Sequence, residues 1–396
     1  MITKFREQFN KAFSQEKYQQ LQHKIEEAAQ SEIAFRLSES PVFLTKDFKE
    51  KVFSAAKSII QQIETFSEEE LNKAIPPDSV APGDASHYHF LAVDFGICKN
   101  EKGEVVPQLI ELQAFPSLFG FQYQYETSLR EVYPFLKEFE RPISEEEYIE
   151  KLYNVVVGSE NPENVILLEL FPEKQKTNID FYITEKLLGI KTVCYTQLIK
   201  EGRKLYYDNK GKKTPINRIY NRVIFDELHH HKELKTQFQF TDNVDVTWVT
   251  HPNWFFKVSK YILPKLHHEF IPDTFYLSEA PKDLNLEQYV LKPLFSFAGS
   301  GINLHPTQEI LDKIEDKENY ILQKKVTYAP LFKDINGDKS KAEIRLLFVK
   351  AEEDEKPYFM TNLVRMTKAD MVNVDFNKKD AIWIGSSIAL FENNAE

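Results

Sequence analysis

Residues 91–115 alternate apolar and polar side chains in two runs that are separated by a turn. The segment reads LAVDFGICKNEKGEVVPQLIELQAF, and its period of two is typical of β-strands. Residues 100–104 include Asn and Gly, which favour a tight turn between antiparallel strands. We therefore predict a β-hairpin whose turn is centred between residues 102 and 103.

The two faces of this predicted hairpin differ in chemistry. With that turn centre, Asp94 lies opposite Glu111, and Ala92 lies opposite Gln113. Facing carboxylates repel each other unless one is protonated or a dication bridges them, and oxygen ligands suit Mg²⁺ or Mn²⁺. The alternative is a solvent-exposed sheet face that binds no metal, and the spacing leaves both open. The other face is apolar and consists of Leu91, Val93, Phe95, Ile110, Leu112 and Ala114.

A second segment, residues 289–301, joins a strand-like run to a glycine-containing loop. Lys292 interrupts the apolar run YVLKPLF, and FSFAGSG follows it. Small residues let backbone N–H groups approach phosphate oxygens, and a lysine on the strand supplies a positive charge. The chain has only 12 glycines in 396 residues, so the pair at Gly299 and Gly301 is conspicuous. The segment is neither a Walker A motif nor a Rossmann fingerprint.

A third segment, AEIRLLFV, places two charged side chains on one face of an otherwise apolar strand. Glu343 and Arg345 share that face, and a turn at residues 352–356 folds the next strand, YFMTNLVRM, back beside it. Arg365 then lies near Glu343. This pattern fits either a cross-strand ion pair or arginines that an acidic neighbour orients towards a polyphosphate.

The N-terminal region reads as helical up to about residue 80. Phe5, Phe9 and Phe13 recur every four residues, a spacing that favours packing into the core. The sequence SEEEL, which begins at Ser67, has the form of a capping box at the start of a helix, and we expect Pro76 to end that helix.

The remaining regions show two further patterns. Short apolar runs alternate with helical ones between residues 160 and 250, as in a small α/β layer, and residues 204–223 read as a hairpin. Residues 254–266 read as one helix, and four strand-like runs follow it. The expected fold class is therefore α/β, or more broadly α+β.

Composition excludes several classes of protein. No apolar run approaches the about 18 residues that span a bilayer, and no secretory signal is visible, so we expect a soluble protein without a membrane partner. Two cysteines, Cys98 and Cys194, are too few for a disulfide framework, which favours the cytoplasm. A net charge of −11 without a basic stripe argues against nucleic acid as a partner.

Together these segments resemble the ATP-grasp superfamily of carboxylate–amine ligases. VLKPLFSFAGSG resembles its nucleotide-binding strand and flexible phosphate loop, YILQKKV its adenine-reading hinge, and EIR the strand that presents an arginine to the phosphates. VDFGICKNEKGEVVPQLIELQAFPSLFG resembles its metal hairpin.

The order of these motifs resembles that of circularly permuted ATP-grasp proteins, typified by the synthetase domain of glutathionylspermidine synthetase. The hairpin precedes the nucleotide-binding strand, and an α/β layer separates them. This resemblance implies four regions. They are an N-terminal helical extension (1–80), the metal-binding hairpin and a helix (85–155), a layer like the pre-ATP-grasp domain (160–250), and the nucleotide-binding part (251–396).

The resemblance also implies roles for individual residues. Mg²⁺ (or Mn²⁺) ligands are implied at Asp94, Glu111 and Gln113, and catalytic arginines at Arg345 and Arg365. The implied ATP contacts are Lys292, Ser296, Gly299, Ser300, Gly301, Gln323, Lys324, Val326 and Lys257. Candidate substrate contacts are Arg218, Arg222 and Ser117.

The implied activity is an ATP- and Mg²⁺-dependent ligase that joins a carboxylate to an amine through an acyl phosphate. Its substrates would be small molecules or peptides, and the N-terminal helices are a candidate surface for an oligomer. Gln113 stands in place of the usual Asn, Ala92 in place of an arginine, and Lys324 and Lys325 where the hinge often has an acid. A nucleotide-binding regulator or scaffold with degenerate chemistry, and an ATP-grasp kinase, therefore remain alternatives.

Overall fold

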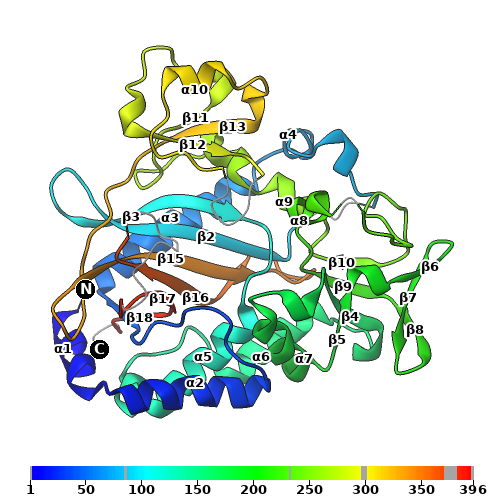
Figure 1. Ribbon diagram of the computed structural model, residues 1–396, viewed down its shortest axis with the longest axis horizontal. Coiled ribbons are helices and arrows are strands. Elements are labelled where there is room, and N and C mark those ends of the chain that lie inside the picture. Colours follow the sequence, from blue (N-terminus) through cyan, green and yellow to red (C-terminus); the bar gives the residue numbers. More distant parts are fainter. Residues whose placement is uncertain (1, 84–86, 232, 296–300, 370–380, 394–396) are drawn as a thin grey trace.

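The computed structural model describes residues 2–83, 87–231, 233–295, 301–369 and 381–393. The fold is a mixed α+β arrangement around a six-stranded antiparallel sheet (Figure 1). Its strands, in spatial order, are β17 (Gly385–Ser387), β16 (Tyr358–Thr367), β15 (Lys339–Val349), β2 (Phe90–Lys99) and β3 (Val105–Gln113), and β14 (Phe332–Lys333) pairs with β15. No helix among the residues in these ranges is both long and apolar enough to cross a membrane.

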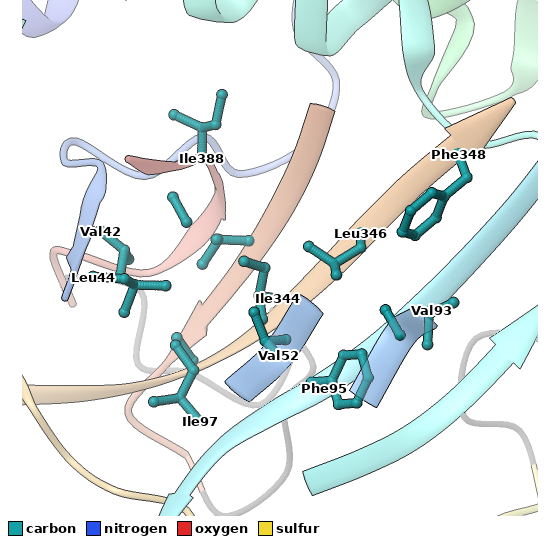
Figure 2. Close-up of a cluster of buried hydrophobic side chains, with 14 of the residues drawn as sticks. Val42, Leu44, Val52, Val93, Phe95, Ile97, Ile344, Leu346, Phe348 and Ile388 are labelled. Carbon is teal, nitrogen blue, oxygen red and sulfur yellow. The ribbon is translucent and has the colours of Figure 1, made fainter. Parts of the chain in front are cut away.

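One face of the central sheet is apolar and packs against the helix α3 (Lys46–Ile63) (Figure 1). Alternate residues of β2 and β15 point to this side, and Figure 2 shows Val93, Phe95, Ile344 and Leu346 around Val52 of α3. The opposite face carries the charged residues, and next to them Phe90, Ala92, Leu347 and Val349 of the same strands pack into a second hydrophobic cluster. Apolar burial on both faces therefore holds these two strands.

The N-terminal residues complete this core. Phe9 is fully buried, as its spacing predicted, and the Ser67 capping box is present. The helix after Ser67 ends at Asn72, four residues before Pro76, so the expected stop was placed too late. The elements are α1 (Thr3–Ala12), α2 (Gln15–Ala29), β1 (Val42–Leu44) and α4 (Glu68–Asn72), and β1 pairs in parallel with β18 (Ala389–Phe391).

A second, four-stranded parallel sheet lies beside the first (Figure 1). Its order is β10 (Thr247–Val249), β9 (Arg218–Asn221), β4 (Val165–Glu169) and β5 (Lys191–Cys194). The neighbouring helices are α5 (Phe119–Val132), α6 (Glu145–Val156), α7 (Asn178–Leu188) and α8 (Phe225–His230). The predicted second hairpin is present as β7 (Lys204–Asn209) and β8 (Lys212–Ile216), with β6 (Ile199–Glu201) beside β7. It is shorter than predicted, because residues 218–221 form β9 of the parallel sheet.

A third, three-stranded sheet lies on the other side of the central sheet (Figure 1). It consists of β11 (Thr274–Tyr276), β13 (Tyr320–Lys324) and β12 (Tyr289–Pro293), and the short α10 (Gln308–Asp312) belongs to the same lobe.

The single helix predicted over residues 254–266 is wrong. The chain forms α9 (Trp254–Lys257) and then a separate 3₁₀ helix, Lys260–Lys265. Ser259 between them is extended, and its hydroxyl caps the N–H of Tyr261 while donating to the carbonyl of Phe256. A serine that satisfies backbone groups in this way competes with a continuous helix.

We predict that the close contact between the N-terminal segment and β17 is essential for stability. Gly385 has φ +101°, and a Cβ there would lie 2.2 Å from the carbonyl oxygen of Arg36. Gly385→Ala should therefore lower the free energy of unfolding by about 3 kcal/mol or more. The control Gly211→Ala also has a positive φ, +86°, but its Cβ would meet nothing within 4 Å, so a loss of about 1 kcal/mol is expected. Equal losses in denaturant titrations would contradict the prediction.

Candidate functional site

The hairpin brings its two carboxylates together as predicted. Asp94 lies opposite Glu111 in the β2–β3 pairing, and Ala92 lies opposite Gln113. The register then shifts by one residue, so Phe95 faces Leu109, and the expected place of Ile110 on the apolar face is wrong. The Ile110 side chain instead lies near Gly96. Such a bulge re-aims the backbone locally, a feature that alternation of side chains alone does not reveal.

Asp94 is held by two arginines from neighbouring strands. Arg345 lies opposite Asp94 in the β2–β15 pairing, and its Nε and Nη2 donate to the two carboxylate oxygens, each at 2.6 Å. Arg365 of β16 donates to Asp94 Oδ2, also at 2.6 Å. The Asp94 side chain is 1% exposed. Bidentate pairing of this kind fixes both position and orientation of a guanidinium.

Glu343 is the second carboxylate that pairs with Arg365. Arg365 and Glu343 face each other across β15 and β16, with 3.0 Å between Nη2 and Oε2, as the sequence predicted. The hydroxyl of Tyr328 donates to the other Glu343 oxygen. Burial raises the pKa of Glu343, and the Arg365 charge opposes that shift.

Glu111 is the more accessible of the two hairpin carboxylates. Its side chain is 30% exposed, and Oε1 lies 3.4 Å from Arg345 Nη2 and 3.8 Å from Arg365 Nη2. Partial burial alone would raise the pKa of Glu111, but the positive charges of Lys260, Arg365 and Arg345 lower it to about 2. Glu111 is therefore ionised at any physiological pH.

Lys292 reaches this cluster from the third sheet. Its Nζ donates to Gln323 Oε1 at 2.6 Å and to the carbonyl of Ile110, the bulged residue, at 3.1 Å. Burial lowers the pKa of Lys292 to about 8, with Glu111 opposing and Lys260 adding to the decrease. An ammonium held this way is poised to lose its charge just above neutral pH.

Lys260 is a site residue that sequence reasoning missed. It begins the 3₁₀ helix Lys260–Lys265, is buried, and is the cation that most lowers the pKa of Glu111. In the sequence it looked like one of several lysines along a continuous helix. Ser259, which interrupts that helix, was the only signal that could have set it apart.

The other predicted nucleotide contacts lie in or near the third sheet. The side-chain oxygen of Gln323 accepts the hydrogen bond from Lys292. Lys324 is partly exposed, and its Nζ lies 3.8 Å from the carboxylate of Asp273. Lys257 is buried against the ring of Trp254 at 5.0 Å. Val326 follows β13 and is half-buried.

The predicted phosphate loop is described only at its end. Gly301 has φ +71°, and a Cβ there would lie 2.8 Å from Pro293 Cγ, so this position requires glycine. Ser296, Gly299 and Ser300 lie outside the described residues.

The predicted substrate residues separate into two groups. Ser117 accepts a hydrogen bond from Arg345 Nη1 at 3.2 Å, and Arg222, just after β9, donates to the neighbouring Pro116 carbonyl. Arg218 lies at the opposite end of β9, where it binds the carbonyls of residues 155 and 156 and pairs with Glu352 at 2.6 Å. The structure thus brings Ser117 to the cluster and Arg222 to the loop beside it, whereas Arg218 lies apart.

The donor set fits a nucleotide-bound Mg²⁺ better than a closed protein cage. In the ranges that the structure describes, no group of three or more His, Cys, Asp or Glu side chains is arranged to hold a metal ion. Mg²⁺ commonly uses one or two carboxylates together with substrate phosphates and water. Glu111 and Gln113, both half-buried and on one face of β3, can supply such oxygens.

Comparison with solved structures shows which known fold this chain resembles. No protein-family model and no curated protein sequence matches the chain. A solved structure of a glutathione synthetase-like effector from Globodera pallida, in its apo form, superposes with a TM-score of 0.57 at 14% identity. The match covers 94% of this chain and 96% of that one. The chain therefore has a glutathione synthetase-like fold over almost its whole length.

Proposed function

We propose that this chain is an ATP- and Mg²⁺-dependent ligase that joins a carboxylate to an amine. The observation that carries the proposal is the convergence of four cations, Lys260, Lys292, Arg345 and Arg365, around the facing pair Asp94 and Glu111. A cluster with both signs of charge suits a polyphosphate accompanied by a metal ion, because the cations bind phosphate oxygens while carboxylates bind the metal. The glutathione synthetase-like fold supports the same class of reaction.

The proposed architecture is a circularly permuted ATP-grasp. The hairpin β2–β3 precedes the strands β12 and β13 in the chain, with the parallel sheet between them. The pairing of β2 with β15 and the bond from Lys292 to Ile110 join these distant segments at one place. In this proposal the adenine lies against the hinge strand β13 and the residues that follow it, up to Val326.

The residues of the site have separate proposed roles. Lys292 and Lys260 bind the phosphates, and Arg345 and Arg365 neutralise the charge on the phosphoryl group as it passes to the substrate carboxylate. Glu111 and Gln113 hold Mg²⁺, which supplies further neutralisation of phosphate charge when bound. The acyl phosphate is then attacked by an amine, and phosphate leaves. The proposed contacts for the carboxylate substrate are Ser117, which follows Pro116 in the chain, and Arg222, which donates to the Pro116 carbonyl.

We expect phosphate release from ATP only when both an acid and an amine are supplied. The measurement is a screen of amino acids, polyamines and short peptides for stimulated release of phosphate. Arg345→Ala should lower the stimulated rate by about 100-fold or more, because the arginine acts on the transferring group itself. The control Arg203→Ala removes an exposed arginine in the turn between β6 and β7, where it pairs with Asp245, and it should change the rate less than about twofold.

Other outcomes of the same screen point to other functions. A stable phosphorylated product in place of free phosphate would indicate a kinase. Tight nucleotide binding without turnover under any condition would indicate a regulatory or scaffold protein. An unchanged rate in Arg345→Ala would contradict the assignment of the site.

Nucleotide affinity should depend on the protonation of Lys292. The pKa of Lys292 is about 8, so the lysine is charged below that pH and loses its charge above it. Binding of phosphate requires the charged form, so affinity should fall roughly tenfold per pH unit above about pH 8. The measurement is calorimetric titration with a non-hydrolysable ATP analogue between about pH 7 and about pH 9.5.

Lys292→Arg is the matched control because a guanidinium stays charged over this range. Its affinity can be lower at every pH, but the fall above pH 8 should disappear. The same fall in both proteins would show that another group controls the pH dependence.

A further inference from the structure

The three oxygen donors predicted for the metal differ sharply in how accessible they are. The Asp94 side chain is 1% exposed, whereas that of Glu111 is 30% exposed and Gln113 is half-buried. Asp94 and Glu111 face each other across one rung of the sheet, but Asp94 lies on β2, between β15 and β3, whereas Glu111 lies on β3 at the end of the strand order. The neighbours of Asp94 on β15 and β16 add to this difference in accessibility.

The surroundings of Asp94 consist of guanidinium groups. Both of its oxygens accept bonds from Arg345, and Oδ2 also accepts a bond from Arg365, all three at 2.6 Å. Each arginine has a second carboxylate at longer range. Arg345 lies 3.4 Å from Glu111, and Arg365 lies 3.0 Å from Glu343. Asp94 is thus the shared, closest counter-charge of both arginines.

A metal ion at Asp94 would have to replace these bonds. It would enter a position that water hardly reaches, displace two guanidinium groups and leave them beside a dication. Glu111 is less obstructed by the arginines, since its contacts to them are longer than 3.3 Å and part of its side chain meets solvent. Lys260 is the cation that acts most strongly on it. A nucleotide-bound Mg²⁺ needs only one or two carboxylates, so Glu111 and Gln113 can meet its requirement without Asp94.

We propose that Asp94 is a positioning residue that orients Arg345 and Arg365 towards a polyphosphate, and that it is not a metal ligand. This proposal rests on the proposed nucleotide site. In it, the bidentate bond fixes the plane of the Arg345 guanidinium, and Nη1 of the same group reaches Ser117 at 3.2 Å. Arg345 and Arg365 are 12% and 32% exposed, so both retain surface with which to meet a ligand. Asp94 also holds the two positive charges close together when no ligand is bound.

The first test measures Mn²⁺ binding by electron paramagnetic resonance, at a saturating concentration of the non-hydrolysable analogue AMP-PNP. Glu111→Gln should weaken Mn²⁺ binding by about tenfold or more, because it removes a charged ligand. Asp94→Asn, nearly the same size, should change Mn²⁺ affinity by less than about threefold. An equal loss in both variants would overturn the proposal.

The second test asks whether Asp94 acts through the arginines. Binding of inorganic tripolyphosphate is measured in EDTA, so that no metal contributes. Arg345→Ala should weaken binding by about tenfold in the unmodified protein but by less than about threefold in the Asp94→Asn background, because an unoriented arginine contributes little. Equal losses in the two backgrounds would show that Asp94 does not position Arg345, and would overturn the proposal.

A third measurement needs no variant and so does not depend on whether Asp94→Asn folds. Pulsed electron paramagnetic resonance spectra of Mn²⁺ with AMP-PNP are recorded for two protein samples, one labelled with ¹³C in glutamate and the other in aspartate. Coupling to labelled glutamate without coupling to labelled aspartate is the expected result. Coupling to aspartate would overturn this proposal and leave the proposed function intact. If the unmodified protein binds no AMP-PNP, the proposed function fails and this proposal fails with it.

Discussion

The antiparallel pairing of β2 with β15 is the interaction on which the rest of the site depends. It sets Arg345 directly opposite Asp94, whose other neighbour in the same row is Glu111. Two carboxylates side by side are unfavourable, and the charge of Arg345, on the strand next to Asp94, compensates the one that is buried. In the adjacent row Glu343 lies between Gly96 and Arg365. A Cβ at Gly96 would lie 2.9 Å from Cys98 Sγ, so glycine lets this row close over a buried thiol.

The cost of burying these charges is met on the other face of the same strands. The main core, where these strands pack with α3, contains Val93, Phe95, Ile344 and Leu346 (Figure 2). Their burial stabilises the pairing of β2 with β15. The charged face is thereby held in a fixed arrangement before any ligand binds. Preorganised charges of this kind act strongly on a developing negative charge because they need not reorient during the reaction.

Local patterns in the sequence predicted this face, and the features they missed arise from distant contacts. The prediction of Asp94 opposite Glu111 is confirmed, but the turn is centred on residue 102 and not between residues 102 and 103, and the bulge makes up the difference. Arg365 lies opposite Glu343, as the turn predicted at residues 352–356 implies. The bulge at Ile110 carries no local signal, because its role is to offer a carbonyl to Lys292, 182 residues away. Likewise β1 and β18 are three residues each, too short to show a period, and only their pairing makes them strands.

The loop after β3 connects the charged cluster with the parallel sheet. Pro116 accepts a bond from Arg222, which follows the carboxyl end of β9, and Ser117 accepts one from Arg345. Ligands of parallel α/β sheets bind outside the carboxyl ends of the strands, so a substrate there would lie beside the residues proposed to bind phosphate. Two adjacent residues of one loop thus touch both arginines. In the proposed site, a group that binds Arg222 and moves this loop would also move the Ser117 contact of Arg345, so the proposed substrate and phosphate sides share one loop.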